Sequence, residues 1–265
     1  MLAAVHQSDL PELIAPPAQS TDFRAELEKR KSYMVAACRA FAQEDFLIGA
    51  AGHVTIRDPE YPDRLWVNPI DVPMRLVLPR DLVCVDANGR VISGARPFSP
   101  SALWVHSRIY QAREDVHSIV HLHSLYGRAF SSLDSPLLPT SVEACVFFED
   151  QAQHRAFRAL AFSPEEGREE GEEIAMALGD NSLLIELNHG LLTVGASVGS
   201  AAFRYIAADS VCHEQLLSRA AGKVICIDAD AARQTHAQIG SEYACWLCFE
   251  PKYREMIALY PEILA

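Results

Sequence analysis

The stretch Ile119-Val-His-Leu-His-Ser124 is the most informative part of this sequence, because it places His121 and His123 two positions apart in an apolar run. Alternate side chains of a β-strand point to the same face, so both imidazoles would meet at the end of one strand and could chelate one metal ion. Left without partners, two imidazoles on one face of an apolar strand would lose their hydration. The alternative is a pair of histidines that form hydrogen bonds at the rim of the fold. A third histidine nearby would favour the metal site.

Three further histidines are candidates for that third position. His189 lies in Asn188-His-Gly190, a predicted turn between two apolar strands, where the adjacent glycine lets the backbone approach the site closely. His106 lies on a predicted helix just before the His121 strand, and His53 follows a glycine at the start of another predicted strand. Spacing alone does not choose among them.

The segments around these histidines predict short strands in the middle of the chain, with helices before, between and after them. Alternation and short apolar runs predict strands at about 53–57, 65–67, 82–85, 90–92, 117–123, 141–148, 182–187 and 191–194. Helical spacing and capping residues predict helices at about 22–45, 101–112, 124–133, 163–179 and 197–221. The fourth of these helices begins with a run of glutamates, which we interpret as a solvated face. This mixture indicates a single α/β domain.

The composition limits the kinds of partner that the chain could bind. Of its 265 residues 49% are hydrophobic and 22% are charged, as in an ordinary globular protein. The 35 acidic residues outnumber the 23 basic ones, and the resulting charge of −12 is unsuited to a nucleic acid or an anionic membrane. No apolar run approaches the ~20 residues that span a bilayer, and residues 1–20 lack the features of a signal peptide. We therefore expect a cytoplasmic protein that binds neither nucleic acid nor membrane. A divalent ion at the histidines would make the local charge positive, opposite to that of the whole chain, and this points to an anionic small molecule as the substrate.

From about residue 22 to residue 226 the chain resembles the class II aldolase and adducin-head family. An ordered set of segments carries the resemblance: Gly52-His-Val-Thr55 with Arg57-Asp-Pro59, Trp66-Val-Asn-Pro69, His106 with Ile109-Tyr110, Val120-His-Leu-His-Ser124, Asn188-His-Gly-Leu-Leu192 with Gly195, and Cys212-His-Glu-Gln215. The resemblance implies an α/β fold, a three-layer α/β/α sandwich with a mainly antiparallel central sheet. It also implies that His121, His123 and His189 hold one divalent metal ion per subunit.

The same resemblance suggests how the chain is organised. Residues 1–20 would form an N-terminal extension and residues 21–226 the aldolase-like domain. Residues 227–265 would form a C-terminal extension that packs on the domain or on a neighbouring subunit. Family members are commonly homotetramers with active sites at subunit borders, so we expect a homo-oligomer.

The sequence departs from the aldolase branch of that family at Ala102. The aldolases have a glutamate at this position, four residues before the residue that matches His106, where it serves as a metal ligand or as an acid/base. In addition, Gly52-His53 stands where the sugar-phosphate aldolases have a Gly-Asn segment that helps to hold the phosphate, and no run of basic residues is nearby. Both differences disfavour a sugar-phosphate aldolase or epimerase.

These observations predict a metal-dependent lyase or decarboxylase that cleaves a C–C bond of a small 2-oxo or 2-hydroxy acid with an aromatic group. Three neutral imidazoles leave the ion its full charge, which suits a chelating oxygen substrate, and Fe2+ or Zn2+ is expected, with Mn2+ as a third choice. One alternative is a non-heme iron oxygenase with O2 as co-substrate. The resemblance to the aminocoumarin antibiotic branch of the family implies this activity, the oxidative decarboxylation of a 4-hydroxyphenylpyruvate-type acid. Another alternative is a non-catalytic, adducin-like assembly module.

Other polar residues are candidates for roles around the ion. Glu143 and Tyr126 are candidates for acid/base support, because they flank the strand region that follows the first two histidines. Four residues are candidates for contacts with the substrate: His53, Thr55, Arg75 and His106. Among these, an arginine suits a substrate carboxylate because it can donate two parallel hydrogen bonds.

Overall fold

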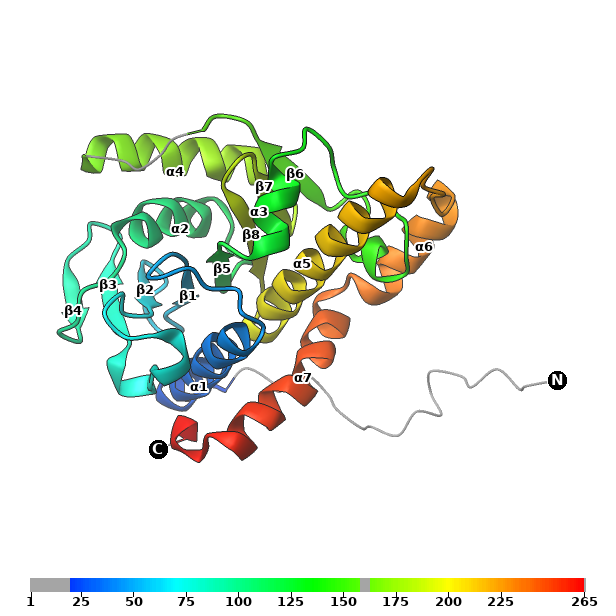
Figure 1. Ribbon diagram of the computed structural model, residues 1–265. Coiled ribbons are helices and arrows are strands. Elements are labelled where there is room, and N and C mark those ends of the chain that lie inside the picture. Colours follow the sequence, from blue (N-terminus) through cyan, green and yellow to red (C-terminus); the bar gives the residue numbers. More distant parts are fainter. Residues whose placement is uncertain (1–19, 158–162, 265) are drawn as a thin grey trace.

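The computed structural model describes residues 20–157 and 163–264. Its helices are α1 (Phe23–Gln43), α2 (Pro100–Ala112), α3 (Leu125–Ser131), α4 (Pro164–Leu178), α5 (Val198–Ala221), α6 (Ala229–Ile239) and α7 (Glu242–Leu259). Short 3-10 helices are η2 (Met74–Leu76), η3 (Pro79–Asp81), η4 (Glu143–Phe147) and η5 (Pro261–Leu264). Helices α2 and α4 cover one face of a central sheet, and α1, α3 and α5 cover the other (Figure 1). This is the predicted α/β/α arrangement.

The sheet contains eight strands of the described residues. They are β1 (His53–Arg57), β2 (Arg64–Val67), β3 (Val83–Asp86), β4 (Val91–Ser93), β5 (Ser118–Leu122), β6 (Gln151–His154), β7 (Leu183–Glu186) and β8 (Gly190–Gly195). Their order across the sheet is β4-β3-β2-β1-β5-β8-β7-β6. Every neighbouring pair is antiparallel except β6 with β7, so the sheet is mainly antiparallel, as predicted.

The central sheet separates the hydrophobic core into two parts, and successive side chains of β5 point alternately into one part and the other. Val120 and Leu122 point into the core shared with α1 and α5, whereas Ile119 points into the core under α2 and α4. His121 lies two residues after Ile119 and therefore faces the α2 and α4 layer. The first histidine of the opening stretch thus points into the space between the sheet and these two helices.

Helix boundaries follow the capping residues that the sequence offers. Asp22 precedes α1, and its carboxylate accepts hydrogen bonds from the backbone N–H groups of Arg24 and Ala25. Ser163 precedes α4 and forms a reciprocal capping box with Glu166, which satisfies two backbone donors that the first turn leaves unpaired. Gly179 ends α4 with a positive φ of 54°, a conformation that glycine adopts without strain. The predicted limits of both helices are thus confirmed to within two residues.

The strand predicted over residues 141–148 is wrong, because this segment forms the 3-10 helix η4. Its residues 144–147 are all buried apolar side chains, and so short an apolar run has no periodicity that separates a strand from a helix. The sequence pattern also gives no indication of β6, since Gln151-Ala-Gln-His154 is mostly polar. That strand lies at the edge of the sheet, where its side chains are only partly buried.

Two glycines allow α4 to pack closely against α2. A Cβ atom added to Gly171 would lie 2.3 Å from the backbone oxygen of Trp104, and one added to Gly167 would lie 2.1 Å from the Trp104 indole. Both distances are shorter than any real contact, so only glycine permits this approach. The approach holds α4 over the face of the sheet toward which His121 points.

Replacing Gly171 with alanine is expected to lower the free energy of unfolding, although this change normally stabilises a helix by up to ~1 kcal/mol. The new methyl group would overlap the Trp104 backbone, which cannot rotate away as the tip of a side chain can. Overpacking of this kind costs about 1–3 kcal/mol, so the net effect is destabilising. Denaturant unfolding measures it, and a variant at least as stable as the wild type would contradict the close packing of the two helices.

Of the two C-terminal helices, α7 packs on the chain's own α1 and α5, whereas α6 packs on η4. Tyr253 of α7 stacks on Tyr33 of α1 with ring centroids 3.7 Å apart, and the Tyr33 hydroxyl donates to Glu250. Helix α7 also runs along α5. Residues 1–19 of the expected N-terminal extension, together with residue 265, lie outside the described part of the chain. Among the described helices, none is both long enough and apolar enough to cross a membrane.

Candidate metal centre

Strand pairing brings the three histidine positions to one edge of the sheet. His121 lies in β5, His123 follows the end of that strand, and His189 lies in the turn between β7 and β8. Because β5 pairs with β8 in antiparallel register, the end of one strand meets the beginning of the other. A Cβ atom on Gly190 would lie 2.9 Å from the Leu122 carbonyl oxygen, so the glycine permits the close backbone approach expected from the sequence.

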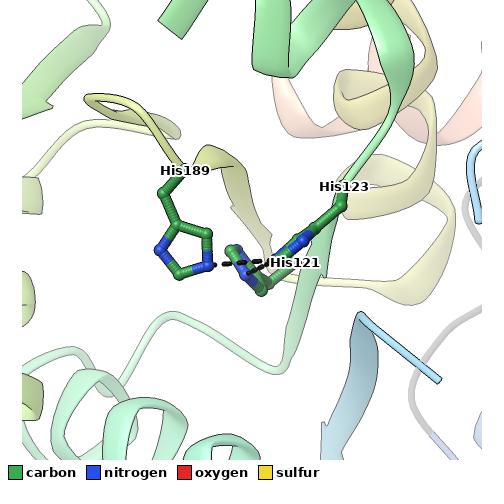
Figure 2. A group of neighbouring side chains, drawn as sticks. All are labelled: His121, His123 and His189. Atoms are coloured by element: carbon green, nitrogen blue, oxygen red, sulfur yellow. Dashed lines mark hydrogen bonds between the residues drawn. The ribbon is translucent and has the colours of Figure 1, made fainter. Parts of the chain in front are cut away.

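The three imidazoles point their Nε2 atoms toward one another (Figure 2). Nε2 of His123 lies 3.2 Å from Nε2 of His121 and 3.0 Å from Nε2 of His189. Nitrogen ligands about 2.0–2.1 Å from a tetrahedral ion lie about 3.3 Å apart, which is close to both distances. The spacing therefore fits one small divalent ion.

A buried carboxylate, Glu186, contacts two of these imidazoles at their Nδ1 atoms, on the side away from the Nε2 cluster. Its Oε1 lies 3.2 Å from Nδ1 of His121, and its Oε2 lies 3.4 Å from Nδ1 of His189. Nδ1 of His121 also lies 3.1 Å from the backbone oxygen of Leu191. Both Nδ1 atoms thus face acceptors and donate toward them, so in the neutral form of either ring the lone pair is on Nε2. A carboxylate behind a histidine in this way orients the ring and raises its basicity toward a metal.

Counting protons shows why a cation suits this cluster. When His121 and His189 are neutral, with the single proton of each ring on Nδ1, neither Nε2 carries a proton to donate to His123. Nε2 of His123 contacts both of these atoms, and a single proton there could serve only one contact. The other contact would bring two lone pairs together. A divalent cation between the three nitrogens satisfies all of them.

The surroundings hold His123 and Glu186 in the protonation states that a metal site needs, whereas they favour the protonated form of His189, whose Nε2 proton an ion would displace. Burial, with the neighbouring His121 and His189, lowers the pKa of His123 to about 3, so this imidazole is neutral near pH 7. Burial alone would raise the pKa of Glu186, but the two histidines outweigh burial and hold that pKa well below its usual value. Burial alone would lower the pKa of His189, but the hydrogen bond with Glu186 outweighs it and raises that pKa. Glu186 is thus an anion that partly balances a cation at the Nε2 atoms.

A cavity of about 240 Å³ opens beside the three imidazoles. Its walls include His53, Ser101 and two carboxylates, Glu170 and Glu186. No lysine or arginine lines it among the residues that the structure describes. Apart from the imidazoles, the polar groups on these walls are therefore neutral or acidic.

The fold and this geometry agree with comparisons to known proteins. A family model for the class II aldolase and adducin N-terminal domain matches residues 32–216. The chain belongs to this family. It is 37% identical over 252 residues to the decarboxylase NovR of Streptomyces niveus, with 94% of this chain and 91% of that protein covered.

Two further relatives carry different names. One is the 4-hydroxy-3-prenylphenylpyruvate oxygenase/4-hydroxy-3-prenylbenzoate synthase of Streptomyces roseochromogenus subsp. oscitans, 36% identical over 254 residues, with 94% of this chain and 89% of that protein covered. The other is a solved structure of an L-fuculose 1-phosphate aldolase from Glaciozyma antarctica PI12, which superposes with a TM-score of 0.84 at 36% identity and covers 93% of this chain and 95% of that one. All three relatives are named as enzymes, and this member of the class II aldolase family is an enzyme as well.

The expected substrate contacts occupy different positions in this class II aldolase fold. His53 lines the cavity, pairs with His121 across β1 and β5, and lies with Nε2 3.3 Å from the Ser101 hydroxyl. His106 is fully buried behind it, with Nδ1 2.8 Å from the Thr55 hydroxyl. Burial holds the pKa of both histidines well below the usual value, so both are neutral. Of these residues, His53 faces the cavity, whereas His106 and Thr55 lie buried behind the cavity wall.

The remaining expected residues lie away from the cavity. Arg75 lines an adjoining cavity, which shares residues 50–52 and Ile70 with the first one. Glu143 is exposed on η4, and Tyr126 stacks on His213 with ring centroids 3.6 Å apart. Neither side chain lines the histidine cavity. An acid/base role beside the ion is therefore not retained for either, because one faces solvent and the other packs on α5.

Two carboxylates of this cavity were not among the residues expected from the sequence. Ala102, at the family's glutamate position, is fully buried in the core beneath α2. Glu170 instead reaches the cavity from α4, although the sequence suggested that this acidic run is solvated. A signal was present, since Gly167, Gly171 and Ile174 mark a buried stripe to which Glu170 belongs. For Glu186, the signal was an acidic residue at the end of an apolar strand, three positions before His189.

Proposed function

We propose that the Nε2 atoms of His121, His123 and His189 hold one divalent ion, and that the enzyme uses it to cleave a C–C bond of a small 2-oxo acid. The observation that carries this proposal is the convergence of three Nε2 atoms at 3.0–3.2 Å from one another along His121–His123–His189, with Nδ1 of His121 and of His189 directed at Glu186. When bound, the ion acts as a Lewis acid that polarises the substrate and stabilises developing negative charge. The neutral His53 and the Ser101 hydroxyl then supply polar contacts from the cavity wall.

Oxidative decarboxylation of a 4-hydroxyphenylpyruvate-type acid is the reaction that we favour, with Fe2+ as the ion and O2 as co-substrate. Two relatives whose sequences each match 94% of this chain are named as a decarboxylase and as a prenylphenylpyruvate oxygenase. Alanine at position 102 supports this assignment, because the enolising carboxylate of the aldolases is missing there. Zn2+ or Mn2+ would suit the non-oxidative alternative, a simple lyase.

A sugar-phosphate aldolase is the second candidate, favoured by the similarity to the L-fuculose 1-phosphate aldolase structure. Two features of the site weigh against it. The cavity has no cationic side chain among the described residues that line it, whereas a phosphate is usually bound by arginine, lysine or helix N-termini. Two carboxylates in the same cavity would repel a phosphate dianion.

Oxygen uptake by the Fe2+-loaded protein tests this choice. With 4-hydroxyphenylpyruvate we expect O2 consumption coupled to CO2 release, and no reaction from the zinc-loaded protein. Cleavage of the same acid without O2 would favour the lyase instead. Cleavage of L-fuculose 1-phosphate with no reaction of the 2-oxo acid would overturn the proposal in favour of an aldolase.

We also propose that the chain works as a homotetramer. Large apolar side chains remain exposed on one protomer, among them Leu125, Val142 and Leu217, each more than half accessible. Apolar surface of this kind is what a subunit interface covers. Light scattering of the purified protein is expected to give about four times the 29.3 kDa chain mass, and a monomer would contradict this.

A further inference from the structure

Glu170 is a carboxylate that the packing of α4 turns into the histidine cavity. Glu170 as a whole residue is only 9% exposed, whereas the side chain of Glu172, two positions further along the same helix, is 62% exposed. Gly167 and Gly171, on the same side of α4, contact Trp104 and leave no room for a side chain. The close contact of α4 with α2 therefore fixes Glu170 at the cavity wall.

The two carboxylates of the cavity lie in different positions relative to the three imidazoles. Both oxygens of Glu186 face the Nδ1 atoms of His121 and His189, so this group is committed to the imidazoles. Glu170 is outside the compact group of three possible ligand atoms that lie within 4.8 Å of one another. It lies on the cavity wall, where a substrate bound to the ion would meet it.

A buried carboxylate discriminates between substrates by charge and by hydrogen bonding. It repels a second anionic group, because charges interact strongly where water is excluded. It accepts a strong, charge-assisted hydrogen bond from a neutral hydroxyl group, and such a bond is worth roughly 10-fold to 100-fold in affinity. One relative is named for a substrate with a 4-hydroxyl group, which is a donor of this kind.

We propose that Glu170 accepts a hydrogen bond from a hydroxyl group of the substrate, and that it thereby selects hydroxylated acids over acids that lack this group. The inference rests on the proposed function, since it assumes that the acid end of the substrate binds the ion. Glu170 is then a specificity-determining residue that contacts the substrate, and it is not a metal ligand.

Binding of two acids to the zinc-loaded protein without O2 tests this inference. The probes are 4-hydroxyphenylpyruvate and phenylpyruvate, which differ in one hydroxyl group, and titration calorimetry gives their dissociation constants. The wild type is expected to bind the hydroxylated acid ~10-fold to ~100-fold more tightly. Glu170→Ala should remove this preference by weakening only the hydroxylated acid. Glu170→Gln should retain part of it, because its amide oxygen still accepts a neutral hydrogen bond.

Glu172→Ala is the matched control, because it removes a carboxylate from the exposed side of the same helix. It should keep the full preference, and all three variants should keep one zinc ion per chain. The inference is overturned if the wild type binds both acids equally, if Glu170→Ala weakens both acids equally, or if that variant loses zinc. Failure of the wild type to bind either acid would instead overturn the proposed function.

Discussion

Replacing His123 with alanine is expected to abolish stoichiometric metal binding and to lower turnover by on the order of 1000-fold. His123 contributes the Nε2 atom that contacts both of the others, so its loss leaves two nitrogens that no longer surround an ion. A Lewis-acid ion contributes several kcal/mol to catalysis, and ~4 kcal/mol corresponds to ~1000-fold in rate. Metal analysis of protein purified without chelator and turnover by the Fe2+-loaded variant measure the two effects.

His213→Ala is the matched control for that experiment. His213 stacks on Tyr126 outside the cavity, so its removal should leave the metal content and turnover within about twofold of the wild type. Circular dichroism of both variants separates loss of the ion from loss of the fold. A His123→Ala protein that still carries one ion per chain would show that the ion is held elsewhere.

Replacing Glu186 with glutamine should weaken metal binding by about 10-fold to 100-fold while preserving the fold. The glutamate offers two acceptor oxygens, one to each Nδ1 atom. Glutamine has the same shape but offers one acceptor and one NH2 donor, so one histidine would meet a donor instead of an acceptor. That histidine gains from moving its proton to Nε2, where the proton competes with the ion.

Competition with a chromophoric chelator measures the affinity of Glu186→Gln for Zn2+. The histidine ligands themselves are unchanged in this variant, so it tests the supporting carboxylate separately from them. We expect a weaker affinity with a normal stoichiometry of one ion at saturation. An affinity within twofold of the wild type would mean that the Leu191 carbonyl and the backbone suffice to orient the imidazoles.

The sequence predicted the parts of this site that depend on local pattern. His121 and His123 were indicated by strand alternation, and His189 by its turn and by the family resemblance. The three histidines lie together in the structure because β5 pairs with β8. The turn between β7 and β8, which carries His189, therefore lies beside the end of β5. The strand and helix patterns indicated a single α/β domain, and the family resemblance implied its layers and its mainly antiparallel sheet.

Residues whose roles depend on long-range packing were harder to predict. Glu170 enters the cavity only because two glycines bring α4 against α2, and no local pattern states which helix covers the histidines. Glu186 of β7 pairs with His121 of β5 across the strand between them, β8. Glu143 was expected near the site because it follows the strand region after the first two histidines, whereas in the structure it begins the 3-10 helix η4 and faces solvent.

X-ray absorption spectroscopy of the zinc-loaded protein tests the central claim most directly. This measurement identifies the ligand atoms around the ion without relying on activity or on a known substrate. We predict scattering from three imidazole rings, with nitrogen atoms at about 2.0–2.1 Å and the remaining coordination by oxygen. Sulfur scattering at about 2.3 Å, or a shell with fewer than three imidazoles, would contradict the three-histidine centre.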